Sequence, residues 1–403
     1  MIIKLAFVLC LISGPAPGQD PSVRTYARAD FVNVEGGGGL SEKVERAAKQ
    51  FKDAKGGDTL WIAYHFPARL GVSIGPFSGM VYRDGDGIRL ERRDSPEGAA
   101  VFLLADATGA RPRVTSVKTL NLNEPYLFEN RPVYWLGNFD AAQSLGQLET
   151  VMRAEPENKA LVRGVLRAVG AHDSPRVVPL LKEIAQKETN AELRRSAVAN
   201  LARVGTAESL DALDDLFKTT PEVALKQEIV RAYASAGERV SERRVLDRLT
   251  AIAKSEEPPE VRREALRRIA GFRGEAVADR LFEIYDRAPD RETRLEILRH
   301  VAVGDGPNDR VLRRLTEIAK RETDPDLQRA AVRRLSPSKG NEQLQALLEI
   351  YDGVSVEPVK EEVIGRLAQS EDRRALDKLV AIAKNDPSAR LRQAAIRRLA
   401  RRS

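Results

Sequence analysis

A short motif recurs along the last two-thirds of the chain and limits its fold more than any other feature of the sequence. Its clearest copies are LTAIAK at 249–254, LTEIAK at 315–320 and LVAIAK at 379–384. A period of 32 to 36 residues with two helical patterns per unit is typical of a helix-pair repeat. The sequence therefore predicts an all-α solenoid of about eight helix pairs over residues 138–403. The last apolar residue of each copy serves as an anchor, at Val151, Ile184, Leu216, Ile252, Ile284, Ile318, Ile350 and Ile382.

Each repeat continues with a second helix, which we number from its first core-facing residue as position 0. Apolar side chains fall mostly at positions 0, +4, +5 and +8, an arc of about 140° at 100° per residue. We expect Ser144 and Gln147 to form a capping box at the first helix, and Asp324 and Asp386 to cap second helices before a proline. The eight second helices are counted from Leu161, Leu193, Leu225, Val261, Thr293, Leu327, Val359 and Leu391.

Two of these second helices carry a resemblance to a known family. Asp324-Pro325-Asp326-Leu327 and Pro259-Glu260-Val261-Arg262 resemble HEAT repeats, in particular the short bacterial, PBS-lyase-type kind with the pattern D-P-x-V-R-x-x-A-x-x-x-L. Gln328 departs from this pattern, which has arginine there. The resemblance covers roughly residues 141–403. It implies a right-handed superhelix with the second helices on its concave side, and protein–protein binding without a specific ligand.

Residues 19–137 have a different pattern and predict a small, strand-rich α+β domain of no family that we recognise. One amphipathic helix is expected at 41–54, and strands at 59–66, 78–83, 88–92, 100–104 and 113–122. Asp84-Gly85-Asp86-Gly87 could suggest a calcium loop, but the twelfth position of such a loop is Ser95 rather than a carboxylate. We therefore predict a hairpin turn at Asp84–Gly87.

The first 18 residues have the three parts of a cleavable signal peptide. Lys4 supplies a positive charge, an apolar run follows at 5–12, and Gly18 precedes the expected cleavage site. The run is shorter than the roughly 20 residues that cross a bilayer, so we expect no membrane span. Cys10 is the only cysteine, and Leu9 before it does not fit a lipoprotein signal. These features predict export to the periplasm or the extracellular space and a mature chain without disulfides.

Position +1 is basic in six of the eight second helices. At about 100° it lies inside the apolar arc, so we expect these side chains to lean over the core and to pair with acids of a neighbouring repeat. Candidate partners are Glu192, Glu260, Glu292 and Asp326. We interpret the row as a structural ladder made of Arg194, Lys226, Arg262, Arg294, Lys360 and Arg392.

Position +6 is also basic in six repeats, but at about 240° it points away from the core. Core packing does not explain such a row. The sequence leaves two interpretations open: a solubilising face with local glutamate partners, or a cationic ridge that docks a protein with an acidic surface. The candidate partner-binding residues are Arg167, Arg231, Arg267, Arg299, Arg333 and Arg397.

The sequence favours an exported, non-catalytic scaffold that binds a protein partner on its concave face. Its three histidines, His65, His172 and His300, lack the spacing of metal ligands, and we identify no catalytic, cofactor-binding or metal-binding residue. Much of the formal net charge of +7 comes from residues 388–403, which hold six arginines and no acid. The excess charge is therefore local. The predicted export disfavours a nucleic-acid partner, although a basic concave groove would otherwise suit phosphates.

Two alternatives remain open at the level of sequence. The chain could be a lyase-like enzyme on a HEAT scaffold, although the predicted export argues against the intracellular substrates of such enzymes. Alternatively, the N-terminal domain could carry the activity while the solenoid presents it. The residues available for that activity are Trp61, Tyr64, His65 and Trp135. The identity of the partner and the oligomeric state are not determined by the sequence.

Overall fold

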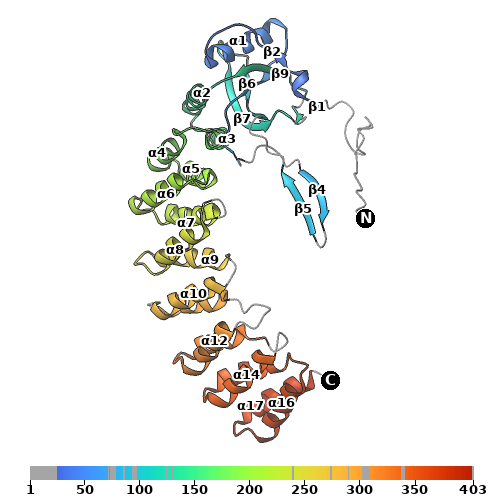
Figure 1. Ribbon diagram of the computed structural model, residues 1–403, viewed down its shortest axis with the longest axis vertical. Helices are drawn as coiled ribbons and strands as arrows, with labels where there is room; N and C mark the ends of the chain where they lie inside the picture. The colour runs from blue at the N-terminus through green and yellow to red at the C-terminus, as the bar shows by residue number, and fades with distance from the viewer. Residues whose placement is uncertain are drawn as a thin grey trace. The chain divides into compact units, whose positions relative to one another are not determined.

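The computed structural model describes residues 25–401, apart from 71, 73–78, 85–86, 93–97, 124–125, 129, 238–239, 273–274, 289, 302–308 and 337–340. The predicted signal peptide therefore lies outside the described residues. The chain divides between Thr219 and Thr220 into two compact units. The first holds the β-strands and helices α1 to α6, and the second holds helices α7 to α17 (Figure 1).

The first unit contains a five-stranded mixed sheet. Its strand order is β2-β9-β3-β6-β7; β9 runs parallel to β2 and β3, and β6 runs antiparallel to β3 and β7. The predictions at 59–66, 100–104 and 113–122 are confirmed. The strands are β2 (Val32–Asn33), β3 (Thr59–His65), β6 (Ala99–Asp106), β7 (Arg113–Asn121) and β9 (Val133–Asn138).

We did not predict β9, which lies between two other strands. Its residues Val133, Tyr134, Trp135 and Leu136 are all buried, so it lacks the alternation by which a half-exposed strand is recognised. Two short ribbons complete the strands: β1 (Thr25–Tyr26) with β8 (Tyr126–Leu127), and β4 (Gly79–Asp84) with β5 (Gly87–Arg92).

The antiparallel pairing of β4 and β5 confirms the predicted hairpin. Asp84 lies opposite Gly87 in the register of the two strands. The turn residues 85–86 themselves lie outside the described residues. Paired strands on both sides of the Asp-Gly sequence are the arrangement expected of a hairpin turn, and they differ from the helical flanks of a helix–loop–helix calcium site.

Each face of the sheet packs against its own set of aromatic side chains. On one face lies α1 (Leu40–Asp53), whose Phe51 meets Tyr134 edge to face with ring centroids 6.0 Å apart. On the other, Trp61 and Trp135 share a buried cluster with Phe102, Phe128 and Phe31. These aromatic residues are core, and this excludes Trp61 and Trp135 as an exposed binding site.

Sixteen helices follow the sheet in the described part of the chain and confirm the predicted eight helix pairs. All eight anchors and all eight second-helix starts are buried. The first helices are α2 (Ala141–Ala154), α4 (Val177–Lys187), α6 (Ala207–Thr219), α8 (Glu242–Ala253), α10 (Glu275–Arg287), α12 (Asp309–Arg321), α14 (Asn341–Gly353) and α16 (Arg373–Asn385). The second helices are α3 (Lys159–Ala171), α5 (Ala191–Val204), α7 (Val223–Gly237), α9 (Pro259–Ala270), α11 (Arg291–His300), α13 (Pro325–Arg334), α15 (Glu357–Leu367) and α17 (Ala389–Ala400).

Two of the predicted helix caps are wrong. At α2 the carboxylate of Asp140, not Ser144, accepts the backbone N–H of Gln143 at 2.8 Å, because the helix begins one turn earlier than we expected. At α17 the cap is Ser388 rather than Asp386. Asp324 does cap α13, by accepting the N–H of Asp326 at 2.8 Å.

The sheet and the first repeats of the first unit share backbone contacts. Just after β3, Ala68 forms an isolated antiparallel bridge with His172, and the N–H of Asp173 donates to the carbonyl of Pro67 at 2.9 Å. The guanidinium of Arg69 donates to the C-terminal carbonyls of two second helices, at Gly170 (2.5 Å) and Val204. A cation is favourable there because it faces the negative ends of both helix dipoles.

A buried polar network crosses the same junction and explains why Ser144 is not a cap. Its hydroxyl lies 3.1 Å from the hydroxyl of Tyr64 and 2.7 Å from Nε2 of His172. Nδ1 of His172 is 2.7 Å from the carbonyl of Ala168, which can only accept, so Nδ1 carries the proton and Nε2 accepts from Ser144 in the neutral ring. Phe66 stacks on the imidazole at 4.1 Å.

Burial lowers the pKa of His172 to about 4, from 6.5 for an ordinary histidine. Protonation therefore favours the unfolded state. The stability that neutral His172 contributes is complete above pH 6.5 and is lost as the pH falls from 6.5 to 4, a loss of roughly 3 kcal/mol. We predict that the first unit unfolds more readily over this range.

The measurement is chemical unfolding followed by tryptophan fluorescence, because both tryptophans of the chain, Trp61 and Trp135, lie in the sheet. His172→Gln should lower the stability at neutral pH and flatten its dependence on pH between 6.5 and 4. The control His300→Gln should keep the wild-type slope. An unchanged slope in His172→Gln would contradict the assignment.

Candidate functional site

The second helices of the second unit lie next to one another from α7 through α9, α11, α13 and α15 to α17. We call the side of these helices that carries positions +3 and +6 the second-helix face. The two positions are about 60° apart around a helix and opposite the apolar arc, so their side chains are neighbours at the surface. This face contains the arginine row in which the sequence predicts partner binding.

The arginines of the predicted row lie at the surface. The side chains of Arg231, Arg267, Arg299 and Arg333 are between 41% and 68% exposed. Arg397 is exposed on α17, and Arg167 is exposed on α3 of the first unit. The structure thus brings together four of the six candidates, one on each of α7, α9, α11 and α13.

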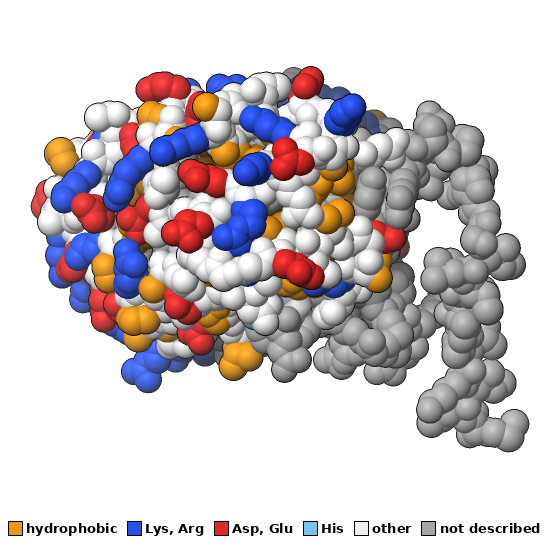
Figure 2. All heavy atoms as spheres, turned by 90° about the horizontal axis from the view of Figure 1, so that it is seen from above, with side chains coloured by type: hydrophobic (Ala, Val, Ile, Leu, Met, Phe, Trp, Pro, Cys, Tyr) orange, Lys and Arg blue, Asp and Glu red, His pale blue; other side chains and the backbone are white. Residues whose placement is uncertain are grey.

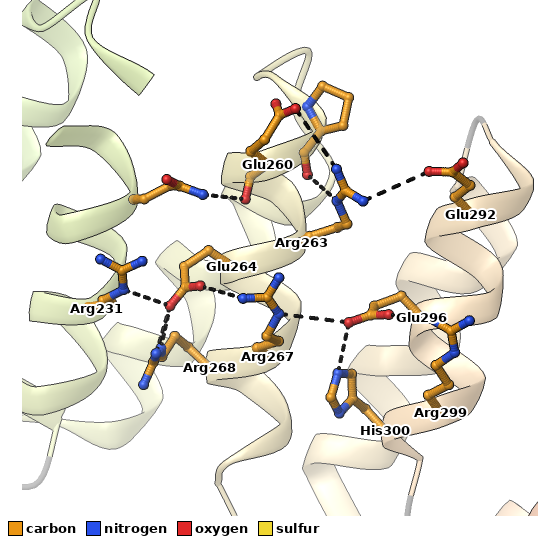
Figure 3. Close-up of polar contacts among 12 residues, drawn as sticks. Arg231, Glu260, Arg263, Glu264, Arg267, Arg268, Glu292, Glu296, Arg299 and His300 are labelled. Carbon is orange, nitrogen blue, oxygen red and sulfur yellow. Dashed lines mark hydrogen bonds and ion pairs between the residues drawn. The ribbon is translucent and has the colours of Figure 1, made fainter. Parts of the chain in front are cut away.

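The row is not the bare cationic ridge of our second interpretation, because glutamates stand between the arginines (Figure 3). They occupy position +3. In α7, α9 and α11 this is three residues before the arginine of the same helix, where an ion pair along one helix is favourable. In α15 position +6 is Gly365, and Glu362 pairs with Arg333 of α13. Our first interpretation includes local glutamate partners, but it does not name these residues, although their spacing is present in the sequence. The four acids are Glu228, Glu264, Glu296 and Glu362.

Glu264 is the most enclosed of these acids, with a side chain that is 1% exposed. Its carboxylate accepts from Arg231 of the preceding second helix at 3.2 Å, and from Arg267 and Arg268 of its own helix at 3.0 and 2.7 Å. Figure 3 shows the three guanidinium groups converging on it. We call this arrangement a rung. A rung consists of one acid, the arginine that reaches it from the preceding second helix, and one or two cations of the acid's own helix.

Glu296 forms the next rung in the same geometry. Arg267 reaches it from α9 at 3.8 Å, and Arg299 and His300 contact it from its own helix at 3.0 and 3.2 Å. Burial alone would raise the pKa of Glu296, but the hydrogen bonds from His300 and Arg299 outweigh it and lower the pKa. The carboxylate therefore keeps its charge, and Arg267 links two successive rungs.

Position +1 lies on the inner side, beneath this face. Lys226 contacts Glu257 at 2.7 Å and Arg262 contacts Asp290 at 3.1 Å. Arg294 lies 3.7 Å from Glu322. Each acid belongs to the segment just before the next second helix, so these pairs join successive repeats. The guanidinium of Arg262 is mostly buried, whereas its neighbours at position +6 are not.

The three other residues of the +1 row make different contacts. Lys360 lies over the ring of Tyr351 at 4.8 Å, and Arg392 donates to the carbonyls of Asp386 and Pro387 at 2.7 and 3.1 Å. Arg194 is partly buried on α5.

The acids that we proposed as partners of the +1 row lie elsewhere. Glu192 pairs with Arg163, Glu260 and Glu292 lie 3.9 Å from Arg263, and Asp326 pairs with Arg291. These acids stand one residue before position 0, on the outer surface, and the acids that reach the inner arginines come from further upstream, before the second helix begins. Sequence spacing alone did not distinguish the two sets.

The described residues contain no group of three or more His, Cys, Asp and Glu side chains arranged to hold a metal ion. His172 is buried in the junction of the first unit, and His300 contacts Glu296. Within the same residues, none of the helices combines the length and apolar character that a bilayer crossing requires. Basic and acidic side chains are interspersed on the face drawn in Figure 2.

Comparison with known proteins identifies the repeats. Residues 148–234 and 312–400 match the family model of HEAT repeats. No curated protein matches the chain.

Three solved structures are similar at low identity. A chain of a Kap95p–RanGDP structure is 14% identical over 63% of this chain and 38% of its own length, with a TM-score of 0.40. Human deoxyhypusine hydroxylase with glycerol is 17% identical over 61% and 98%, with a TM-score of 0.26. A structure of microtubule polymerases with TOG-domain arrays is 12% identical over 64% and 74%, with a TM-score of 0.23.

The rung at Glu264 leads to a prediction about stability. Glu264→Gln should lower the free energy of unfolding by about 1–3 kcal/mol, because it leaves three guanidinium groups around a neutral, buried side chain. The control is Glu292→Gln, whose side chain is 78% exposed and lies 3.9 Å from Arg263; it should change stability by about 0.5 kcal/mol or less. Chemical unfolding followed by circular dichroism compares the two. Equal losses in both variants would contradict the importance of the rung.

Proposed function

Because residues 148–234 and 312–400 are HEAT repeats, we propose that the chain is an exported, non-catalytic scaffold that docks a protein with an acidic surface on its second-helix face. HEAT repeats support a scaffold for protein binding. The partner's acidic character and the docking face are inferred from the chain's own residues. The observation that carries the proposal is the recurrence of exposed arginines on four adjacent second helices, α7 to α13.

Ionic contacts between successive repeats come from the inner +1 pairs as well as from the rungs, so the +6 arginines are not the sole ionic link. Arg262 and Lys226 join neighbouring repeats from the inner side. The +6 guanidinium groups stay partly exposed in spite of their glutamate partners, and each has five N–H donors, more than its contacts with these glutamates occupy. An incoming carboxylate can therefore add to a rung without dismantling it.

Such a face favours recognition that depends on salt. Successive second helices pack roughly 8–10 Å apart, which is comparable with the Debye length in physiological salt. Each rung thus interacts with a partner almost independently of its neighbours. The summed positive potential of the rungs speeds the association of the partner. Arginine suits this role because its planar fork binds a carboxylate through two parallel hydrogen bonds.

Docking can be tested by replacing the row and an equal number of arginines on the other layer. Arg231, Arg267, Arg299 and Arg333 are changed to Gln, which removes charge and keeps a donor. The control changes Arg280, Arg287, Arg310 and Arg321 to Gln, on the first helices α10 and α12. Crosslinking of each full-length protein in its native cells should capture an acidic partner with wild type and control, and lose it with the row variant.

The proposal predicts that high salt also weakens capture by the wild type. If the row variant captures the same partners as the wild type at low and at high salt, the face is only a solvated surface. Folding of both variants is checked by circular dichroism, so that loss of capture cannot be confused with unfolding.

Export is part of the proposal and has its own test. The charged, apolar and small segments of residues 1–18 support cleavage after Gly18, and no cysteine follows Cys10. Protein recovered from outside the cytoplasm should have the intact mass of a chain that starts at Gln19. Exported protein that still begins at Met1 would contradict cleavage.

A further inference from the structure

One rung of the second-helix face lacks its acid. Position +3 holds Glu264 in α9, Glu296 in α11 and Glu362 in α15, but in α13, between the last two, it holds Ala330. Helices α11, α13 and α15 pack in succession, so Ala330 occupies the place of a rung acid. The series is interrupted inside the row, not at its end.

The cations of the missing rung are all present. In α9 the carboxylate of Glu264 is held by the +6 arginine of the preceding helix and by positions +6 and +7 of its own helix. The residues at these three positions around Ala330 are Arg299, Arg333 and Arg334. The rung of α13 thus repeats the three arginines around Glu264 without the glutamate.

The structure has a pocket at this place. It has a volume of about 300 Å³, and it is lined by Arg299, Arg333 and Arg334 together with the small side chain of Ala330. Leu298 contributes an apolar wall. The pocket thus brings the three arginines of the incomplete rung together with the alanine that stands at the position of a rung acid.

The neighbouring carboxylates are held by other contacts. Asp326 lines the pocket as well, but it pairs with Arg291 and lies 3.4 Å from Arg329. Arg299 uses Nη1 for Glu296, and Arg333 uses Nε for Glu362, each at 3.0 Å. Most donors of these two guanidinium groups are therefore available to a ligand in the pocket.

Arg334 shows how the missing acid affects the electrostatics of this rung. It is half-buried, and its Nε donates to the carbonyl of Val301 at the end of α11 at 2.8 Å. Burial lowers its pKa, and the charge of Arg366 adds to this effect. At the complete rung burial also works against Arg231, but the carboxylates of Glu228 and Glu264 outweigh it and raise the pKa.

We propose that the pocket around Ala330 is a binding site for a carboxylate of an acidic peptide segment, which takes the place that Glu264 occupies in its own rung. The proposal deepens the proposed function, since it names one docking point on the second-helix face and the group that enters it. A carboxylate is favoured over other anions because the neighbouring rungs, built on the same backbone, are closed by carboxylates.

The first test supplies the missing acid within the chain. In the full-length protein, Ala330→Glu should raise the melting temperature and should weaken binding of fluorescein-labelled hexaglutamate at least about tenfold, measured by fluorescence anisotropy. Ala330→Gln has a side chain of nearly the same size and no charge, so it should not raise the melting temperature. A variant Ala330→Glu that binds the peptide as tightly as the wild type overturns the proposal.

The second test compares arginines of the open and the closed rung. Arg334→Gln should weaken hexaglutamate binding about tenfold, because Arg334 belongs to the open rung alone. Arg268→Gln removes the equivalent arginine of the rung that Glu264 closes, and it should change binding less than about twofold. Equal effects of the two variants would mean that the peptide binds the face without using the pocket, and would overturn the proposal.

Control ligands decide the chemistry of the site. Hexaglutamine should not bind, and inorganic phosphate should not displace hexaglutamate at equal concentration of anion. Displacement by phosphate would overturn the assignment to carboxylates.

If hexaglutamate does not bind while the row variant loses its partner, this inference fails and the proposed function stands. If the peptide binds through Ala330 but the row variant keeps its partner, the proposed function fails instead.

Discussion

A single helix pair of this chain buries too little apolar surface to be stable, so every repeat depends on contact with its neighbours. The anchors from Val151 to Ile382 supply that contact, and all eight are buried. Their period fixes which positions of each helix face inward. The angle of a charged residue relative to this apolar arc then decides whether it joins repeats, as Arg262 does with Asp290 from within the arc, or faces the solvent on the opposite side.

Much of the repeat architecture could be predicted from the sequence because it depends on local periodicity. The sixteen helices of the described repeats and the exposure of Arg267 follow from the period and from about 100° per residue. The partners of the charges did not follow, because they depend on which side chains of two adjacent helices meet. The glutamates at position +3 are the exception, since the spacing of Glu264 and Arg267 was present in the sequence and was not used.

The sheet was harder to predict for a physical reason. Its strand β9, which lies between β2 and β3, is apolar on both faces and therefore has no alternation, and these two neighbours come from distant parts of the chain. Ser144 shows the same limit: by its spacing it looked like a cap, but it is buried against Tyr64 and His172. A buried polar group needs such partners, so the network fixes how the sheet meets the first repeat.

In our proposal, one geometry of the second-helix face serves both stability and recognition. A rung closed by its own carboxylate neutralises the arginines around it, as Glu264 does for Arg231 and Arg267. Where the carboxylate is absent, the equivalent arginines retain donors, and the most buried of them, Arg334, is disfavoured as a cation by burial and by the charge of Arg366. The free energy that a closed rung would contribute to folding is then available to a ligand that brings its own carboxylate. A single alanine among glutamates is sufficient to convert a structural contact into a site of this kind.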